Sequence, residues 1–146
     1  MKLDPIFTVK ENKLYKIADN SQVDAASLRR IEIPWSTVEM EDEIYNEDFL
    51  AVLRDQLKQM ETAGTFAILV PIVDKPLTND EQTEYFINAY NHTARRVKDC
   101  ESVAGFELPV ELKDTAAFIE KLAIKHAQYV YFSKAENVTD GSIVKY

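Results

Sequence analysis

Side chains that could do chemistry follow the predicted strands. Trp35 and Ser36 end the first long strand, Asp74 follows the second, and Glu111 follows the third. In an open parallel sheet, ligands gather outside the carboxyl ends of the strands, so we expect any functional site to lie there. Trp35 at such an end could stack on a sugar ring, because aromatic faces pack against apolar ones. Its alternative place is the hydrophobic core.

A pair of carboxylates sets the chemistry that these positions could perform. Two carboxyl groups about 5 to 9.5 Å apart, one protonated and one ionised, can hydrolyse a glycosidic bond. Glu107 and Glu111 cannot form that pair on one extended strand, because residues spaced roughly 3.3 Å apart place them about 13 Å from each other. Asp74 and Glu111 are the better pair if their strands are neighbours. The alternative is that both are exposed loop carboxylates.

The elements that must position these residues alternate between strands and helices. Asn46 can cap a helix whose apolar residues recur at helical spacing until Gly64 ends it. The continuous apolar run 65–73 is typical of a strand that is covered on both faces in a parallel sheet. Further strands are predicted at 28–35, 102–108 and 129–133, and further helices after a capping box of Thr78 and Glu81 and after Asp114.

This alternation predicts one α/β domain over residues 1–146. Its core, residues 28–133, is a four-stranded parallel sheet with right-handed helical crossovers. Residues 1–20 form a β-hairpin with a polar connection at 10–13, and residues 134–146 form a tail. The sheet is either an open half-barrel or a flat, doubly wound sheet.

The choice between these two sheets bears on oligomeric state. An open half-barrel would leave inner-face residues such as Ile33, Leu69 and Phe106 uncovered. A homodimer would cover them, and we expect one in that case. A flat sheet with helices on both faces would allow a monomer.

Charge and composition narrow the function classes. The 25 acidic and 17 basic residues give a net charge of −8, which repels phosphate backbones and anionic lipids, so neither nucleic acid nor membrane is an expected partner. No signal-peptide pattern opens the sequence, which favours a cytoplasmic protein, or a secreted one if a signal peptide preceding Met1 was removed.

Metal and cofactor sites are not expected. Cys100 is the lone cysteine, and His92 and His126 lie too far apart for a zinc spacing. We expect Cys100 to be a small buried or half-buried residue. We expect the two histidines, each within a helix, to lie at the surface or in the core with their hydrogen bonds satisfied. The three glycines make no phosphate-binding pattern, so nucleotide cofactors are disfavoured.

Several segments resemble the first half of a cellulase-type (β/α)-barrel glycoside hydrolase. The hairpin that precedes such barrels is similar to FTVKENKLYKIADN, and an early strand is similar to RRIEIPWS. The next helix and strand resemble YNEDFLAVLRDQLKQMETAGTFAILVPI, and the fourth strand resembles VAGFELPVEL. The resemblance implies a sugar substrate at the strand ends, with Glu111 in the acid/base position and with Glu32, Trp35 and Ser36 among the substrate-binding residues.

The sequence also departs from that family's pattern. Val110 stands where the family has asparagine, and Glu32 falls where its motif usually has arginine. The second carboxylate of the family belongs to a strand beyond this chain. The resemblance therefore implies a glycosidase-like half-barrel that is not an independent hydrolase and that could bind carbohydrate. The alternatives are an interaction or scaffolding module without a small-molecule site, and an enzyme assembled from two chains that each give one carboxylate.

Overall fold

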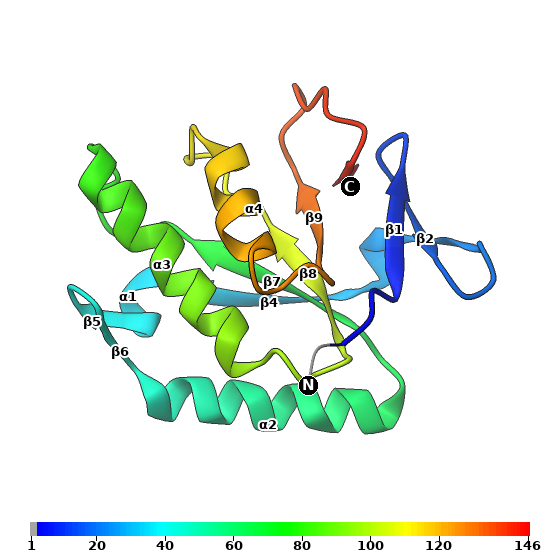
Figure 1. Cartoon of the computed structure of the whole chain (residues 1–146), viewed down its shortest axis with the longest axis horizontal. Coiled ribbons are helices and arrows are strands. Elements are labelled where there is room, and N and C mark those ends of the chain that lie inside the picture. The colour runs from blue at the N-terminus through cyan, green and yellow to red at the C-terminus, as the bar shows by residue number, and fades with distance from the viewer. Residues whose placement is uncertain (1–2) are drawn as a thin grey trace.

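Five parallel strands form the main sheet of the computed structural model, which describes residues 3–146 (Figure 1). They lie side by side in the order in which they follow one another in the chain. Their bounds are β4 (Arg29–Pro34), β7 (Ala67–Ile72), β8 (Val103–Glu107), β9 (Val130–Ser133) and β10 (Ile143–Lys145).

This unbroken strand order selects the half-barrel over the doubly wound sheet. A doubly wound sheet reverses its strand order at a switch point and carries helices on both faces. Here the buried hydrophobic residues of α2 (Glu47–Ala63), α3 (Asp80–Arg96) and α4 (Thr115–Ala123) all belong to one core cluster on one face of the sheet. The chain therefore winds in one direction, with its helices outside and the other face of the sheet, the inner face, free of them.

Local capping explains where the helices begin and end. Asn46 Oδ1 accepts a hydrogen bond from Phe49 N at the start of α2, and Gly64 takes the left-handed φ of 74° that ends it. Asp114 caps α4 in the same way, with its Oδ1 3.0 Å from Ala117 N. The predicted N-cap of α3, Thr78, is wrong by one residue.

Asn79, not Thr78, is the N-cap of α3. Its Oδ1 accepts from Gln82 N at 2.8 Å, while Gln82 Oε1 accepts from the backbone N of Thr78, also at 2.8 Å. Asparagine is as good a cap as threonine or better, and glutamine can close the reciprocal bond as glutamate does.

The predicted four-strand count is corrected by β10. This strand lies in the predicted tail and pairs in parallel with β9, with Ile143 opposite Tyr131. The connection from β9 contains no helix, so the short β-prone segment had no crossover pattern to mark it as a sheet strand.

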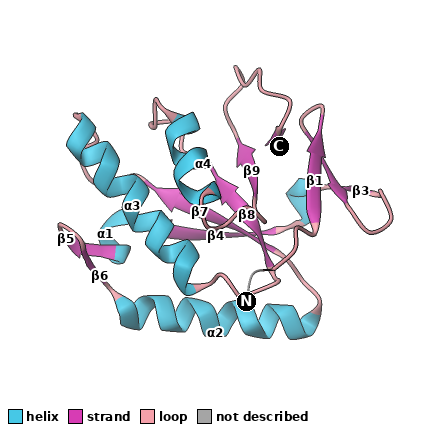
Figure 2. Ribbon diagram, in the orientation of Figure 1, coloured by secondary structure: helices cyan, strands magenta, loops and turns pink. Residues whose placement is uncertain are grey.

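A small antiparallel sheet covers the inner face. It consists of β1 (Phe7–Lys10), β2 (Lys13–Lys16) and β3 (Gln22–Val23), and Figure 2 places it at the side of the molecule away from α3 and α4. Phe7 and Leu14 pack in one cluster with Ile68, Val70 and Phe132 of the main sheet. The open half-barrel is thus closed by its own N-terminal segment.

The turn between β1 and β2 is tighter than predicted. Only Glu11 and Asn12 connect the strands, and both have a positive φ, as a type I′ hairpin requires. Asn12 N donates to Gly141 O at 3.0 Å, and Asn12 Nδ2 donates to the carbonyls of Asp140 and Ile143, both at 2.7 Å. These bonds fix the small sheet to the segment that leads into β10.

The structure reverses the expected direction of three core residues. Ile33, Leu69 and Phe106 are fully buried against the helices and do not face the inner side. Strand side chains alternate between faces, so the inner face carries the residues on either side of them. The reason given for a homodimer, an uncovered inner face with these three residues, does not hold.

Short elements connect the larger ones. A 3₁₀ turn, η1 (Ala25–Ser27), precedes β4, and one helical turn, α1 (Trp35–Val38), follows it directly. The hairpin of β5 (Glu39–Glu41) and β6 (Ile44–Tyr45) leads into α2. None of these four elements follows from the sequence pattern, because each is too short to show a period.

Candidate functional site

Ser36 and Asp74 meet at the carboxyl ends of β4 and β7. Asp74 Oδ1 accepts from Ser36 N at 2.9 Å, and its Oδ2 accepts a short hydrogen bond from the Ser36 hydroxyl. The two strands are paired in register up to Pro34 and Ile72, so the residues that follow them emerge together. Both side chains are exposed. Two of the predicted site residues are therefore neighbours, 38 positions apart in the sequence.

Trp35 lies in the core instead of presenting a face to a ligand. Its side chain is 3% exposed, and its ring meets that of Phe86 edge-on at 5.1 Å. The chain turns into α1 directly after Pro34, which carries the indole beneath α3. The prediction of a sugar-stacking platform at Trp35 is corrected by this burial.

Glu39 forms a buried polar cluster beside that indole. Trp35 Nε1 donates to Glu39 Oε1 at 2.8 Å, and Glu43 N donates to Oε2 at 2.9 Å. Lys75 Nζ lies 3.7 Å from Oε1 and 4.9 Å from the centre of the indole ring. A carboxylate that is 1% exposed needs such partners, because an unpaired buried charge is very costly. This cluster holds Lys75, and with it the strand end that carries Asp74, in place.

Glu32 and Glu107 are the carboxylates of the inner face. Glu32 is exposed near the end of β4, on the same side of that strand as Arg30. Arg30 Nη2 donates to both Glu107 oxygens, at 2.9 and 3.0 Å, and the Tyr146 hydroxyl donates a short hydrogen bond to Oε1. Sequence reasoning missed the arginine and the tyrosine. The available signal was a glutamate inside the otherwise apolar strand 102–108, which requires a partner when it is buried.

The protonation of Tyr146 fits this arrangement. Burial, followed by the hydrogen bond to Glu107, raises the pKa of the Tyr146 phenol well above its ordinary range. The phenol therefore keeps its proton and donates a hydrogen bond to the Glu107 carboxylate. Lys134 Nζ lies 3.6 Å from the centre of the Tyr146 ring, so Lys134 is a second cation, after Arg30, in contact with this tyrosine.

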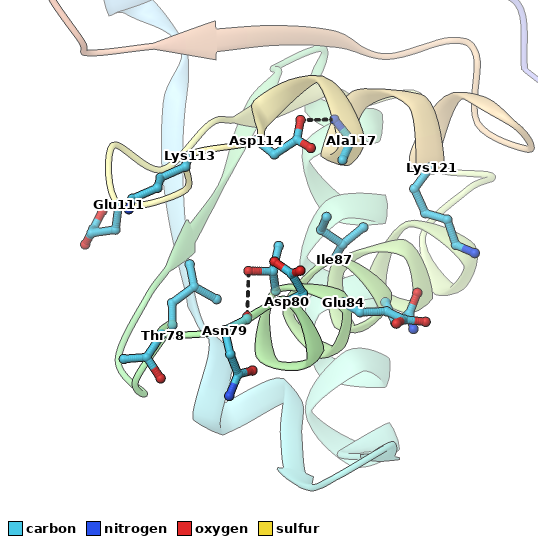
Figure 3. A pocket seen from close by; sticks show the side chains of 13 residues that line it. Thr78, Asn79, Asp80, Glu84, Ile87, Glu111, Lys113, Asp114, Ala117 and Lys121 are labelled. Carbon is cyan, nitrogen blue, oxygen red and sulfur yellow. Dashed lines mark hydrogen bonds between the residues drawn. The ribbon is translucent and has the colours of Figure 1, made fainter.

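Glu111 lies elsewhere, in the turn after β8. It is exposed and lines a groove of about 650 Å³ between the N-terminal half of α3 and α4 (Figure 3). In that view Glu111 and Lys113 stand at one end of the groove and Lys121 at the other, with Asp114 between them. No hydrogen bond or ion pair within residues 3–146 joins Glu111 to Asp74.

These positions decide what the site can do chemically. The carboxylates of Asp74 and Glu107 are both engaged by donors of the chain itself, and Glu111 borders the helix side of the sheet. Hydrolysis of a glycosidic bond needs one free carboxylic acid and one carboxylate on opposite sides of the same bond. The described residues at the strand ends offer hydroxyl, carboxylate and ammonium groups suited to hydrogen bonding.

Neither histidine nor the cysteine adds reactive chemistry. Burial and the neighbouring Asp99 carboxylate raise the pKa of the Cys100 thiol to about 11, so it is not a thiolate at neutral pH. His92 is held by Glu47 at 3.1 Å, and His126 is buried. Within residues 3–146, no group of three or more His, Cys, Asp or Glu side chains is arranged to hold a metal ion. Over the same range no helix is long and apolar enough to cross a bilayer.

Comparison by sequence identifies no relative: no family model and no curated protein matches the chain. Comparison by structure gives clear matches. An endo-glycoceramidase II from Rhodococcus sp., described as a lactosyl-enzyme intermediate, superposes with a TM-score of 0.57 at 13% identity. That match covers 71% of this chain and 40% of the enzyme.

Two further structures agree with this match. A GH5_18 protein from Bifidobacterium longum subsp. infantis matches with a TM-score of 0.56 and 9% identity, over 77% of this chain and 36% of that one. A variant GH5_18 protein from Bifidobacterium longum subsp. longum, in complex with Manβ1-4GlcNAc, gives 0.55 and 12% over the same shares. The chain thus has the fold of part of a GH5-type glycoside hydrolase barrel and spans well under half of these enzymes.

Proposed function

We propose that this chain is a non-hydrolytic, glycosidase-like half-barrel that binds carbohydrate at the carboxyl ends of its first two sheet strands. The strand-end site consists of Glu32, Ser36 and Asp74, with Lys75 at its base. The observation that carries the proposal is the hydrogen-bonded pair of Ser36 and Asp74, exposed at the edge where ligands of parallel α/β folds gather.

The chemistry of this pair suits a sugar. A carboxylate can accept hydrogen bonds from two adjacent hydroxyl groups, and a serine hydroxyl both donates and accepts. Among the similar structures, one holds a lactosyl-enzyme intermediate and another a Manβ1-4GlcNAc complex, which supports neutral β-linked disaccharides as the first ligands to test.

The absence of hydrolysis follows from the carboxylates. Glu107 is the inner-face carboxylate of β8, and its oxygens already accept hydrogen bonds from Arg30 and Tyr146. Glu111, which the resemblance put in the acid/base position, borders a different groove. Among residues 3–146, neither Glu107 nor Glu111 is therefore placed to act with Asp74 as the second carboxyl group that hydrolysis requires.

Titration of the ¹⁵N-labelled protein with lactose, cellobiose and Manβ1-4GlcNAc tests the proposal. We expect amide shifts centred on Ser36, Asp74 and Lys75, together with no release of monosaccharide. The variant Asp74→Asn keeps the shape but loses the charge, and should weaken binding. The matched control is Asp48→Asn, at an exposed carboxylate in the first turn of α2. Equal binding by both variants would place the sugar elsewhere.

A second candidate is an interaction module that pairs with another copy of itself through the β5–β6 hairpin. Met40 is 56% exposed and Ile44 is 50% exposed, and this two-stranded sheet pairs with no other strand of the described chain. Free strand edges are templates for pairing. Light scattering over a dilution series would reveal a dimer that Met40→Lys dissociates, and a constant monomer mass would exclude this candidate.

A further inference from the structure

A second hollow, of about 330 Å³, lies between the C-terminal parts of α3 and α4. It adjoins the groove that contains Glu111, since Asn88 and Lys121 line both. The described residues that line it include three lysines or arginines and two histidines, but no aspartate or glutamate. We call this hollow the basic pocket. Its lining includes Tyr45, Asn91, His92, Arg95, Lys121 and Lys125.

The charge of this pocket runs against that of the whole chain. Acidic residues outnumber basic ones by 25 to 17, so a patch with cations and no carboxylate departs from the surface average. Arg54, Lys58 and Arg96 all have carboxylate partners within 4 Å. Within residues 3–146, Arg95, Lys121 and Lys125 form no ion pair. Their positive charge is therefore left for a ligand.

One wall of the pocket is flat and fixed. The rings of Tyr45 and His92 stack at 4.2 Å with an angle of 16° between them. His92 Nε2 lies 3.1 and 3.2 Å from the two oxygens of Glu47, which Arg96 also holds with two bonds of 2.9 Å. The aromatic wall is thus anchored from outside the pocket and does not depend on a ligand for its order.

A polar atom within this region has no partner. Asn91 Oδ1 is buried and accepts no hydrogen bond from the described residues. Leaving such an acceptor without a donor is costly, and a turn of the Asn91 amide toward the pocket would let a ligand hydroxyl satisfy it. The pocket therefore offers both cations for an anion and an acceptor for a hydroxyl group.

We propose that the basic pocket binds a small ligand with a tetrahedral oxyanion, a phosphate or sulfate ester, and at least one hydroxyl group, as in a sugar phosphate. Arg95, Lys121 and Lys125 bind the anion through charge-assisted hydrogen bonds, and Asn91 accepts from the hydroxyl. The site lies between the helices, on the other side of the sheet from the inner face, so it does not depend on the strand-end site.

Calorimetric titration at low salt tests this proposal with four probes: glucose 6-phosphate, glucose 6-sulfate, inorganic sulfate and glucose. We expect both esters to bind more tightly than glucose, and inorganic sulfate to bind more weakly than either ester because it has no hydroxyl for Asn91. A preference for one ester identifies phosphate or sulfate as the natural group. No heat from either ester at about 10 mM would overturn the proposal.

Variants locate the site. Lys121→Gln combined with Lys125→Gln should weaken the tighter ester by about tenfold or more, because two of three cations are removed. Lys98→Gln is the matched control, at an exposed lysine outside the pocket lining. Cations in the last turn of a helix also offset its dipole, so thermal unfolding is recorded for each variant. Unchanged affinity in the folded double variant, or an equal loss in Lys98→Gln, would overturn the proposal.

Discussion

Arg30 and Glu107 are 77 positions apart in the sequence and form a two-pronged ion pair on the inner face of the half-barrel. The strand β7 lies between their own strands, so the pair bridges three strands. Glu107 is the inner-face carboxylate of β8, and it accepts hydrogen bonds from the Arg30 guanidinium and from the Tyr146 phenol. Residues of the chain itself thus cover the inner face and also compensate the charge of the Glu107 carboxylate.

Glu107→Gln should lower the free energy of unfolding by about 1 kcal/mol. The change keeps the shape but removes the charge that Arg30 and Tyr146 bind, and the 39% exposure of Arg30 limits the loss through solvent screening. Urea denaturation measures it. Glu111→Gln, at an exposed carboxylate, is the control and should leave stability unchanged; an equal loss in both variants would contradict the assigned role of the pair.

Gly105→Ala should prevent or severely impair folding. A Cβ at this position would lie 1.6 Å from Val130 O in the neighbouring strand, so β8 and β9 could no longer pair as they do. We expect a loss of more than about 3 kcal/mol, above the usual range for overpacked sites, because the clash is with backbone atoms that cannot move aside. Gly141→Ala is the matched control, because its Cβ would meet nothing closer than 3.9 Å. Similar melting temperatures for the two variants would show that the strands are not packed this closely.

Leu14→Ala should destabilise the protein by about 2 to 5 kcal/mol, because it removes a buried side chain between the small sheet and the inner face. Ile17→Ala, at a side chain that is 50% exposed just after the same strand, should have little effect. Thermal and urea unfolding of both variants measure the difference. If Leu14→Ala were as mild as Ile17→Ala, the small sheet would not be the cover of the half-barrel.

Asp99→Asn should make stability less sensitive to acid. The hydrogen bond from Arg54 lowers the pKa of the Asp99 carboxyl below its ordinary 3.8, so its contribution is complete above that value and is lost as the pH falls through the lowered pKa. We expect the variant to be less stable at pH 7 by at most about 1 kcal/mol, because both side chains are about 40% exposed.

The pH dependence of that difference is the test. The gap between Asp99→Asn and the parent protein should narrow as the pH falls below 3.8 toward the lowered pKa of Asp99, measured as urea midpoints at several pH values. A gap of the same size at both ends of the range would mean that the charge of Asp99 is not what stabilises the fold.

Local signals carried much of the fold. Asn46, Gly64 and the apolar stripe between them suffice to predict α2, and the continuous run 65–73 predicts a central strand. The fifth strand could not be predicted in the same way. Ile143–Lys145 is too short to show a period, and its place in the sheet depends on pairing with β9 and on bonds from Asn12.

The site was harder to predict, because it depends on register. The rule that parallel strands end together predicts that Ser36 and Asp74 lie at one edge of the sheet, and there the two residues meet. It gave no information about which side chains turn inward, and so Ile33, Leu69 and Phe106 were assigned to the wrong face. The partner of Glu107 cannot be read from the sequence either. It depends on the strand register, which places Arg30 of β4 within reach of Glu107 of β8.

The most direct test of the account is the ¹⁵N titration with Manβ1-4GlcNAc and lactose, followed by analysis of the same samples for released sugar. We predict amide shifts confined to the ends of β4 and β7, weaker in Asp74→Asn at the same ligand concentration, with the disaccharides left intact. Hydrolysis, or no shift at about 10 mM ligand, would contradict the claim that this half-barrel binds carbohydrate without cleaving it.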